Sequence, residues 1–262
     1  MLSGFIAGLT YPFRALGLLA RTPRLWSYIL VPVLVNIAVG ATLYLGLLLA
    51  GFRSIDAFVA GLPTWAAALG ALLRALLVVG LLIVTGFVLV RFGVVLGAPW
   101  YTKLSNQLEW LQTGRVLPEE PFGLGVIARD LGRALLFEIQ KLLLVLAIGL
   151  GLLLLNLIPV IGQALAIAGG VALGATITCL DFFDYPLERR RLGFRHKLRL
   201  IRQSMPASAG FGLACLWLVS IPFVNLLSIP LCVAAGTLFF CDRLATIGAG
   251  VRPAAGEGEV AA

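Results

Sequence analysis

Two long uncharged blocks constrain the fold of this chain more than any other feature of its sequence. Residues 142–180 and residues 203–241 each contain 39 consecutive positions without Asp, Glu, Lys or Arg. One straight helix of that length would extend for about 58 Å, whereas the hydrocarbon core of a bilayer is about 30 Å thick. Both blocks are interrupted near the middle, around Pro159 and Pro222, by proline and asparagine, which mark turns. We therefore predict two helical hairpins, each with both ends on the same side of a membrane.

The composition of the whole chain excludes a soluble globular protein. Hydrophobic residues make up 60% and charged residues 12% of the 262 positions, whereas soluble domains contain about 25% charged residues. Two further apolar stretches predict membrane crossings at residues 25–52 and 75–98. The expected fold is an all-α polytopic membrane protein with two long transmembrane helices, two hairpins that cross the bilayer or stop partway, and interfacial amphipathic helices. We expect one membrane domain over residues 1–250 and a disordered tail over residues 251–262.

Three polar stretches have the pattern of amphipathic helices that lie at a membrane interface. The first covers residues 101–111 and is expected to stop at Gly114, and the second covers residues 127–141. The third places its apolar residues on one face and its basic residues on the other, with Arg195, Lys197, Arg199 and Arg202 expected to face outward.

The distribution of basic residues predicts the orientation in the membrane. Of the 20 Lys and Arg residues, 18 fall on one side of the predicted crossings, and only Arg53 and Arg74 lie on or near the other side. Because loops rich in Lys and Arg stay in the cytoplasm, we expect that side to be cytoplasmic and both termini to lie there. The formal net charge of +8 therefore indicates membrane topology rather than nucleic-acid binding.

Signatures of catalysis and of cofactor binding are missing from the sequence. It contains no zinc-protease, nucleophile-elbow, Walker A or dinucleotide-binding motif, and its single histidine, His196, lies in a basic stretch. The four cysteines are scattered through apolar segments and form no metal-ligand pattern. We expect no enzymatic activity, no metal and no cofactor.

Two sets of polar residues are candidates for contacts with anions. The arginine run Arg189, Arg190 and Arg191 would attract anionic lipid headgroups or anionic solutes, or would act only as a topology anchor. Four amides in or beside apolar segments would line a pathway, or would cap turns and bridge packed helices. These amides are Asn36, Asn156, Gln163 and Asn225.

Several short motifs, taken together, resemble the CysZ sulfate permeases of bacteria, which are related to the eukaryotic etoposide-induced proteins of the endoplasmic reticulum. The motifs are Thr22-Pro23, residues 29–37 (ILVPVLVNI), Ala98-Pro99, Ile158-Pro159-Val160-Ile161-Gly162-Gln163, Asp184-Tyr185-Pro186, Pro222-Phe223-Val224-Asn225 and Cys241-Asp242-Arg243. The resemblance implies a homo-oligomeric protein of the bacterial inner membrane that admits sulfate for cysteine synthesis.

The resemblance also implies a sulfate site where the first long helix begins. Relatives carry Pro-Gly, an apolar residue and two arginines there, whereas this chain has Pro23, Arg24, Leu25, Trp26 and Ser27. The arginine pair is absent, but Arg21, Thr22 and Arg24 are close to Pro23 in sequence. A helix N-terminus with nearby guanidinium groups suits a dianion. The alternative is that Arg21 and Arg24 anchor the helix at lipid phosphates.

Two other functions are compatible with the same sequence pattern. Shallow hairpins and a basic run would also serve a membrane scaffold that shapes the bilayer and binds anionic lipids without transporting anything. A third possibility is an accessory subunit of another transporter. Sulfate or a related oxyanion remains the expected substrate of the leading hypothesis, a permease or channel.

Overall fold

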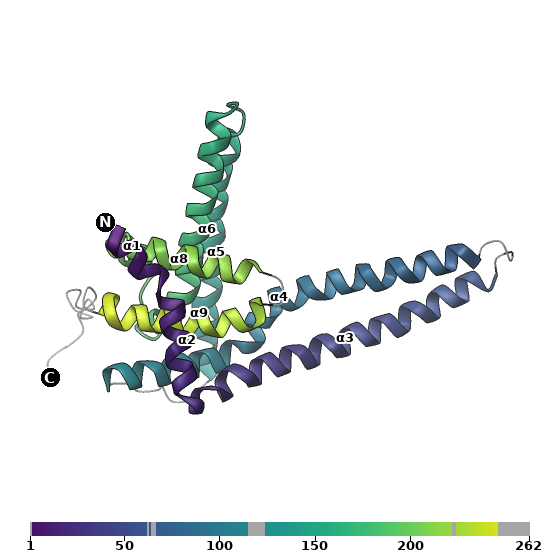
Figure 1. The fold of residues 1–262 in the computed structure, drawn as a ribbon, viewed down its shortest axis with the longest axis horizontal. Helices are drawn as coiled ribbons and strands as arrows, with labels where there is room; N and C mark the ends of the chain where they lie inside the picture. Colours follow the sequence, from purple (N-terminus) through teal and green to yellow (C-terminus); the bar gives the residue numbers. More distant parts are fainter. Residues whose placement is uncertain (1, 62, 64–66, 115–123, 222–223, 246–262) are drawn as a thin grey trace.

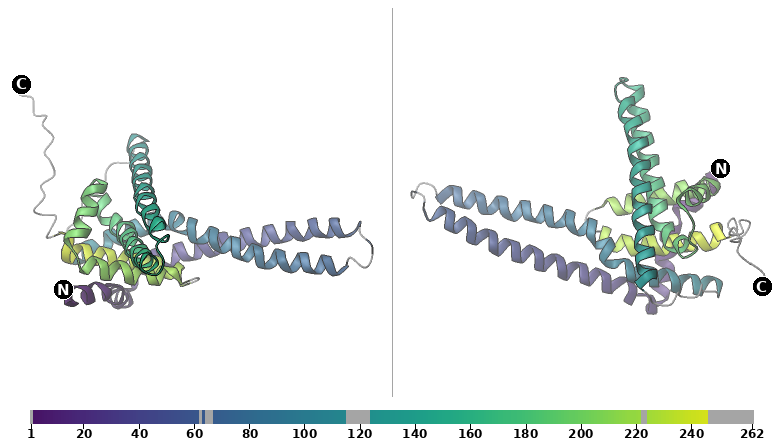
Figure 2. Two further views of the ribbon diagram at one scale, coloured as in Figure 1. Left: turned by 90° about the horizontal axis from the view of Figure 1, so that it is seen from above. Right: turned by 180° about the vertical axis from the view of Figure 1, so that it is seen from behind.

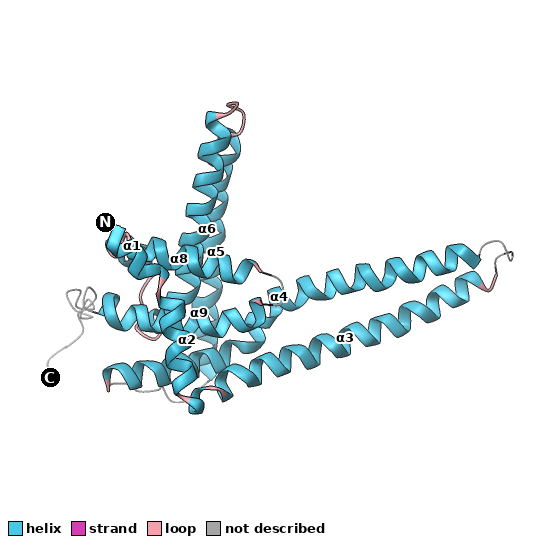
Figure 3. Cartoon of the chain, in the orientation of Figure 1, coloured by secondary structure: helices cyan, strands magenta, loops and turns pink. Residues whose placement is uncertain are grey.

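The computed structural model describes residues 2–61, 63, 67–114, 124–221 and 224–245. In that part of the chain the secondary structure is helical and contains no strand (Figure 3). The predicted all-α class is therefore confirmed. The predicted tail at residues 251–262 lies outside the described residues.

The helices follow one another with short connections. In chain order they are α1 (Leu2–Leu9), α2 (Tyr11–Arg21), the 3₁₀ turn η1 (Pro23–Leu25), α3 (Ser27–Val59), α4 (Ala67–Thr113), α5 (Leu124–Leu155), α6 (Ile161–Glu188), α7 (Phe194–Gln203), α8 (Ala207–Ser220), α9 (Asn225–Phe239) and the π-helical turn η3 (Phe240–Leu244).

Two long antiparallel pairs project from a central group of shorter helices (Figure 1). The pair α3–α4 and the pair α5–α6 extend in different directions, as both views of Figure 2 also show. Their outward apolar side chains, such as Leu34, Leu76 and Leu153, are exposed. Such surfaces suit lipid rather than water. Six segments of the described chain are long and apolar enough to cross a membrane, and these are Leu2–Arg21, Pro23–Val59, Ala68–Gly86, Gly132–Leu155, Ile161–Glu188 and Leu226–Leu244.

The two uncharged blocks differ in the structure. The helices α5 and α6 are 32 and 28 residues long and meet at a turn that contains Asn156 and Pro159. The helix α8, in contrast, has 14 residues, which is about 21 Å of helix and less than the thickness of the hydrocarbon core.

Two predicted interfacial helices prove to be parts of longer helices. The predicted helix at residues 101–111 is the last part of the 47-residue α4, and residues 127–141 lie inside α5. Within α4, Pro99 is the single proline, and a helix can continue past one proline at the loss of one backbone hydrogen bond. The expected stop is confirmed, because α4 ends at Thr113 and Gly114 adopts a positive φ of 66°.

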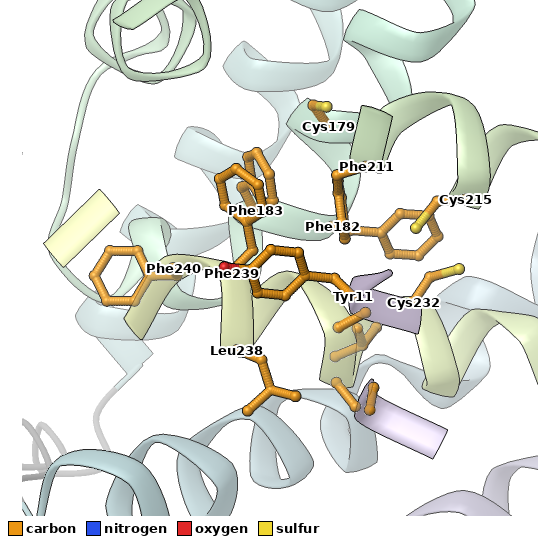
Figure 4. Close-up of a cluster of buried hydrophobic side chains, with 14 of the residues drawn as sticks. Tyr11, Cys179, Phe182, Phe183, Phe211, Cys215, Cys232, Leu238, Phe239 and Phe240 are labelled. Carbon is orange, nitrogen blue, oxygen red and sulfur yellow. The ribbon is translucent and has the colours of Figure 1, made fainter. Parts of the chain in front are cut away.

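The hydrophobic core lies where α2, α6, α8 and α9 meet (Figure 4). The rings of Phe183 and Phe211 stack with centroids 4.7 Å apart, and those of Phe183 and Phe239 are 4.9 Å apart. Tyr11, near the beginning of the chain, packs on Phe239 with a centroid distance of 4.8 Å. The core thus joins the N-terminal helices to the last helices, and both hairpins are attached to it.

The short helix α1 lies directly against α8. A Cβ atom on Gly8 would be 2.0 Å from the carbonyl oxygen of Ala207, and one on Gly210 would be 2.1 Å from the carbonyl oxygen of Phe5. No real Cβ atom approaches a backbone oxygen that closely, so both positions require glycine.

Candidate functional site

The predicted anion-site residues lie at the corner between α2 and α3. Arg21 ends α2, Thr22 follows, and Pro23 and Arg24 belong to η1. The indole Nε1 of Trp26 donates a hydrogen bond of 2.9 Å to the Leu19 carbonyl and so ties the corner to α2.

The long helix begins later than the sequence indicated. The sulfate site implied by the resemblance places the start of the long helix at Pro23, but α3 begins at Ser27. The intervening turn is closed by 3₁₀ hydrogen bonds of 3.0 Å from the Leu25 amide to the Thr22 carbonyl and from the Trp26 amide to the Pro23 carbonyl. Thr22 occupies the N-cap position of η1, but its side chain makes no capping hydrogen bond. The positive end of the long helix therefore lies beyond Arg24 rather than at Pro23.

Arg21 and Arg24 are exposed, and neither has an ion-pair partner among the residues that the structure describes. Several basic residues of the central group do form ion pairs. Arg14, for example, lies 2.9 Å from Asp242, and Lys141 lies 2.8 Å from Asp181. In the part of the chain that the structure describes, the two positive charges at the corner between α2 and α3 have no carboxylate within ion-pair distance.

The four candidate amides do not come together. Asn36 is buried in α3, whereas Asn156 and Gln163 are exposed at the turn of the α5–α6 pair. Because the α3–α4 and α5–α6 pairs point in different directions, these amides do not line one pathway within a single chain (Figure 1). Asn225 begins α9, and its side chain lies outside the described residues.

Arg189 and Arg190, at the end of α6, converge on a single carboxylate. Arg189 Nη2 lies 2.7 Å from Glu109 Oε2, and Arg190 Nη2 contacts Glu109 Oε1. The Glu109 side chain is only 5% exposed, although Glu109 is a charged residue of the stretch 101–111 that we predicted to be an amphipathic interfacial helix. The Arg190 guanidinium also lies 4.2 Å from the ring centroid of Phe240. Two arginines of the predicted lipid or anion contact are therefore used for packing α6 against α4.

Polar side chains complete this charge cluster. Arg189 also donates hydrogen bonds to Asn106 and Ser105, and the Thr237 hydroxyl on α9 donates to Ser105 Oγ over 2.9 Å. Burial lowers the pKa of Arg189, and the negative charge of Glu109 opposes that shift. The cluster joins α4, α6 and α9. Arg191, the third residue of the run, is exposed and adopts a positive φ of 53°.

Lys197 was expected to face outward, and that expectation is wrong. The residue is 1% exposed, and its ammonium group lies 2.6 Å from Glu188 and also contacts Asp184. The ring of Phe137 covers the ammonium, with the centroid 4.4 Å away. The reason is that α7 packs against the acidic end of α6, whose carboxylates take up the charge. Arg195, Arg199 and Arg202 do face outward.

The sequence did not indicate that Glu109, Asn106 and Ser105 act together. The available signal was their spacing, because Ser105 and Glu109 lie one helical turn apart and share a face with the buried Leu108. The sequence does not show that Arg189 and Arg190 pack against this face, so it could not be identified as a contact surface.

Tyr101 gives a prediction about pH. Its ring is buried against the edge of Tyr185, and burial raises its pKa from 10.0 to about 12. The folded protein disfavours the phenolate, so the neutral phenol of Tyr101 contributes to the free energy of unfolding. That contribution is complete below about pH 10 and is lost as the pH rises through about 12. We expect the phenolate absorbance that disappears in Tyr101→Phe to titrate near pH 12 in the folded protein. Titration at the ordinary value would show that the phenol is hydrated.

The fold is that of a polytopic α-helical membrane protein, and Arg21 and Arg24, which have no ion-pair partner among the described residues, lie in the turn just before its first long apolar helix. A family model described as "Sulfate transporter CysZ/Etoposide-induced protein 2.4" matches residues 11–230. The chain belongs to this family, as its motifs predicted.

Individual relatives match over most of their length. The chain is 28% identical over 243 residues to a protein named "Sulfate transporter CysZ" from Pectobacterium atrosepticum, covering 93% of this chain and 87% of the relative. Proteins of the same name match at 30% identity in Vibrio cholerae serotype O1, with 87% and 90% coverage, and in Pseudomonas aeruginosa, with 90% and 94% coverage. The names of these relatives denote transporters and not enzymes.

Proposed function

We propose that this protein is a permease or channel that carries sulfate, or a related oxyanion, into the cytoplasm for sulfur assimilation. Its relatives named sulfate transporters match it along most of both chains. Its exposed apolar helices suit a bilayer, and the expected location is the bacterial inner membrane with both termini in the cytoplasm. Assembly as a homo-oligomer is part of the proposal.

The observation that carries the proposal is the pair of arginines at the corner between α2 and α3. Arg21 and Arg24 have no carboxylate partner among the described residues, so their charges are available to a solute. Two guanidinium groups match the charge of a dianion and donate charge-assisted hydrogen bonds to its oxygens. Thr22 and Pro23 hold the two arginines on one short turn, and the hydroxyl of Thr22 is a further donor.

Uptake of labelled sulfate into liposomes tests this proposal. We expect liposomes with wild-type protein to take up sulfate faster than empty liposomes. The uptake rate of the double variant Arg21→Ala/Arg24→Ala should be at least about tenfold lower than that of wild type, because hydrogen bonds to charged groups contribute about 1.5–3 kcal/mol each. The matched control is Arg195→Ala/Arg199→Ala, which removes the same charge from exposed positions on α7. The control should transport like wild type.

The possible results test the assignment of the site and the transport function separately. Unchanged uptake in the Arg21/Arg24 double variant would remove the site assignment and leave transport standing. No uptake by the wild-type protein would overturn the transport proposal, and liposome tubulation without anion flux would then indicate a membrane scaffold. Copurification with another transporter would instead indicate an accessory subunit.

A further inference from the structure

Trp26 lies at the corner between α2 and α3 and covers the carbonyl end of α2. Its indole Nε1 donates a hydrogen bond of 2.9 Å to the Leu19 carbonyl, which also accepts one of 3.1 Å from the Thr22 amide. A carbonyl oxygen has two lone pairs, so the Leu19 oxygen has no acceptor capacity left. Trp26 is 48% exposed and follows directly on η1, the turn that carries Arg24. The indole therefore closes the end of α2 beside this turn.

Other carbonyl oxygens of the corner are also occupied. The two 3₁₀ hydrogen bonds of the turn use the carbonyls of Thr22 and Pro23. The Ser27 hydroxyl donates a hydrogen bond of 3.3 Å to the Arg24 carbonyl. These oxygens bond within the corner itself and are not free to face a ligand.

The carbonyl end of a helix is an unfavourable neighbour for an anion. It carries a partial negative charge of about half an elementary charge, and its last carbonyls have no partner within the helix. Arg21, at the end of α2, offsets part of this charge. Because the Leu19 carbonyl bonds to the Thr22 amide, it lies at the same corner as Arg21 and Arg24. Without the indole, the corner would present a bare acceptor beside the two arginines.

A bare carbonyl would also change which oxyanion binds best. Sulfate at neutral pH has no proton and only accepts hydrogen bonds, whereas hydrogen phosphate keeps one proton that it can donate. A carbonyl with a free lone pair repels sulfate through its partial charge and accepts the proton of hydrogen phosphate. A site whose carbonyls are covered leaves that proton without a partner, which costs binding free energy.

We propose that Trp26 is a positioning residue that makes the anion site at Arg21 and Arg24 selective for oxyanions without a proton, such as sulfate. The indole holds η1 against the end of α2 and removes the Leu19 carbonyl as an acceptor. The Thr22 hydroxyl can donate and accept, so it does not discriminate between the two anions. This inference rests on the proposed transport site and adds the class of anion that the site accepts.

Equilibrium binding of labelled sulfate to the protein in detergent, with inorganic phosphate as competitor, tests the inference without requiring transport. Trp26→Phe keeps an aromatic ring but removes the Nε1–H donor. We expect the ratio of the Kd for phosphate to the Kd for sulfate to fall about fivefold, because the freed carbonyl favours the protonated anion. The matched control is Trp217→Phe on α8, whose side chain is 68% exposed, and it should keep the wild-type ratio.

Two further measurements separate selectivity from stability. Trp26→His places a ring N–H at a position equivalent to Nε1, so above about pH 8, where the imidazole is neutral, it should keep the wild-type ratio. A ratio that falls equally in Trp26→His and Trp26→Phe would show that the donor is not the cause. With the wild-type protein, selenate should displace sulfate at least about tenfold better than phosphate does. Equal displacement by selenate and phosphate would overturn the inference without any variant.

The remaining results distinguish this inference from the transport proposal. If Trp26 only stabilises the corner or anchors it at the membrane interface, Trp26→Phe weakens both anions equally, and that unchanged ratio would overturn the inference. Absence of sulfate binding to wild type, or binding that persists in Arg21→Ala/Arg24→Ala, would overturn the site and the inference with it. The expected change of ratio without uptake into liposomes would support the inference and overturn transport alone.

Discussion

We expect Glu109→Gln to lower the free energy of unfolding by about 3 kcal/mol, because it leaves Arg189 and Arg190 without their shared counter-ion. Gln has nearly the shape of Glu, so packing is retained and the charge alone is removed. The arginines cannot simply turn to water, since their side chains are only 17% and 29% exposed. Thermal unfolding of the protein in detergent micelles measures the effect.

Two further variants isolate the electrostatic cause. Glu138→Gln removes an equal charge from a side chain that is 54% exposed, and its partner Lys141 keeps Asp181, so we expect a cost of less than about 0.5 kcal/mol. Adding Arg190→Met to Glu109→Gln should recover part of the lost stability, because one uncompensated charge disappears. A Glu109→Gln protein as stable as Glu138→Gln would contradict the role of the charge cluster in joining α4 to α6.

Gly8→Val separates α1 from α8 and destabilises the protein by about 3 kcal/mol. Even the first carbon of the new side chain would lie 2.0 Å from the carbonyl oxygen of Ala207, so the helix axes must move apart. The movement also exposes Gly210, which lies equally close to the backbone of Phe5. We expect a lower unfolding temperature and faster hydrogen exchange of the α1 amides.

A glycine in open space is the control for this prediction. A Cβ atom added to Gly17 on α2 would have no neighbouring atom within 4 Å, so Gly17→Ala should gain up to about 1 kcal/mol from helix propensity. Equal stability of Gly8→Val and wild type would show that α1 does not pack on α8 as the structure places it.

The sequence predicted the class of fold because apolar length is a local property. A long uncharged run in a membrane must satisfy its own backbone hydrogen bonds, and a helix does so within the segment. The continuity of α4 and α5 was missed, since helix ends were inferred from changes of polarity, and polarity changes at Tyr101 and Lys141 without a helix break.

The charge pairs could not be predicted for a different reason. Lys197 occurs in a basic stretch, and nothing in that stretch indicates that α7 lies against Asp184 and Glu188. Arg189 and Arg190 are likewise separated from Glu109 by about 80 residues, and their pairing depends on how α4 and α6 pack. The candidate site at Arg21 and Arg24 stays a prediction, and its residues lie together because they are neighbours in sequence.

The contact between Tyr11 and Phe239 has a consequence for synthesis in the cell. Tyr11 leaves the ribosome well before Asp242, to which its hydroxyl donates a hydrogen bond, because Asp242 is 231 positions later in the chain. The two legs of the α3–α4 pair contact each other, as do those of the α5–α6 pair, so each pair can enter the bilayer while translation continues. The hydrophobic core and its contact between Tyr11 and Asp242 can be completed only after η3 has left the ribosome. A chain truncated before α9 would therefore insert into the membrane but lack the part of the core in which Tyr11 and Phe183 pack on Phe239.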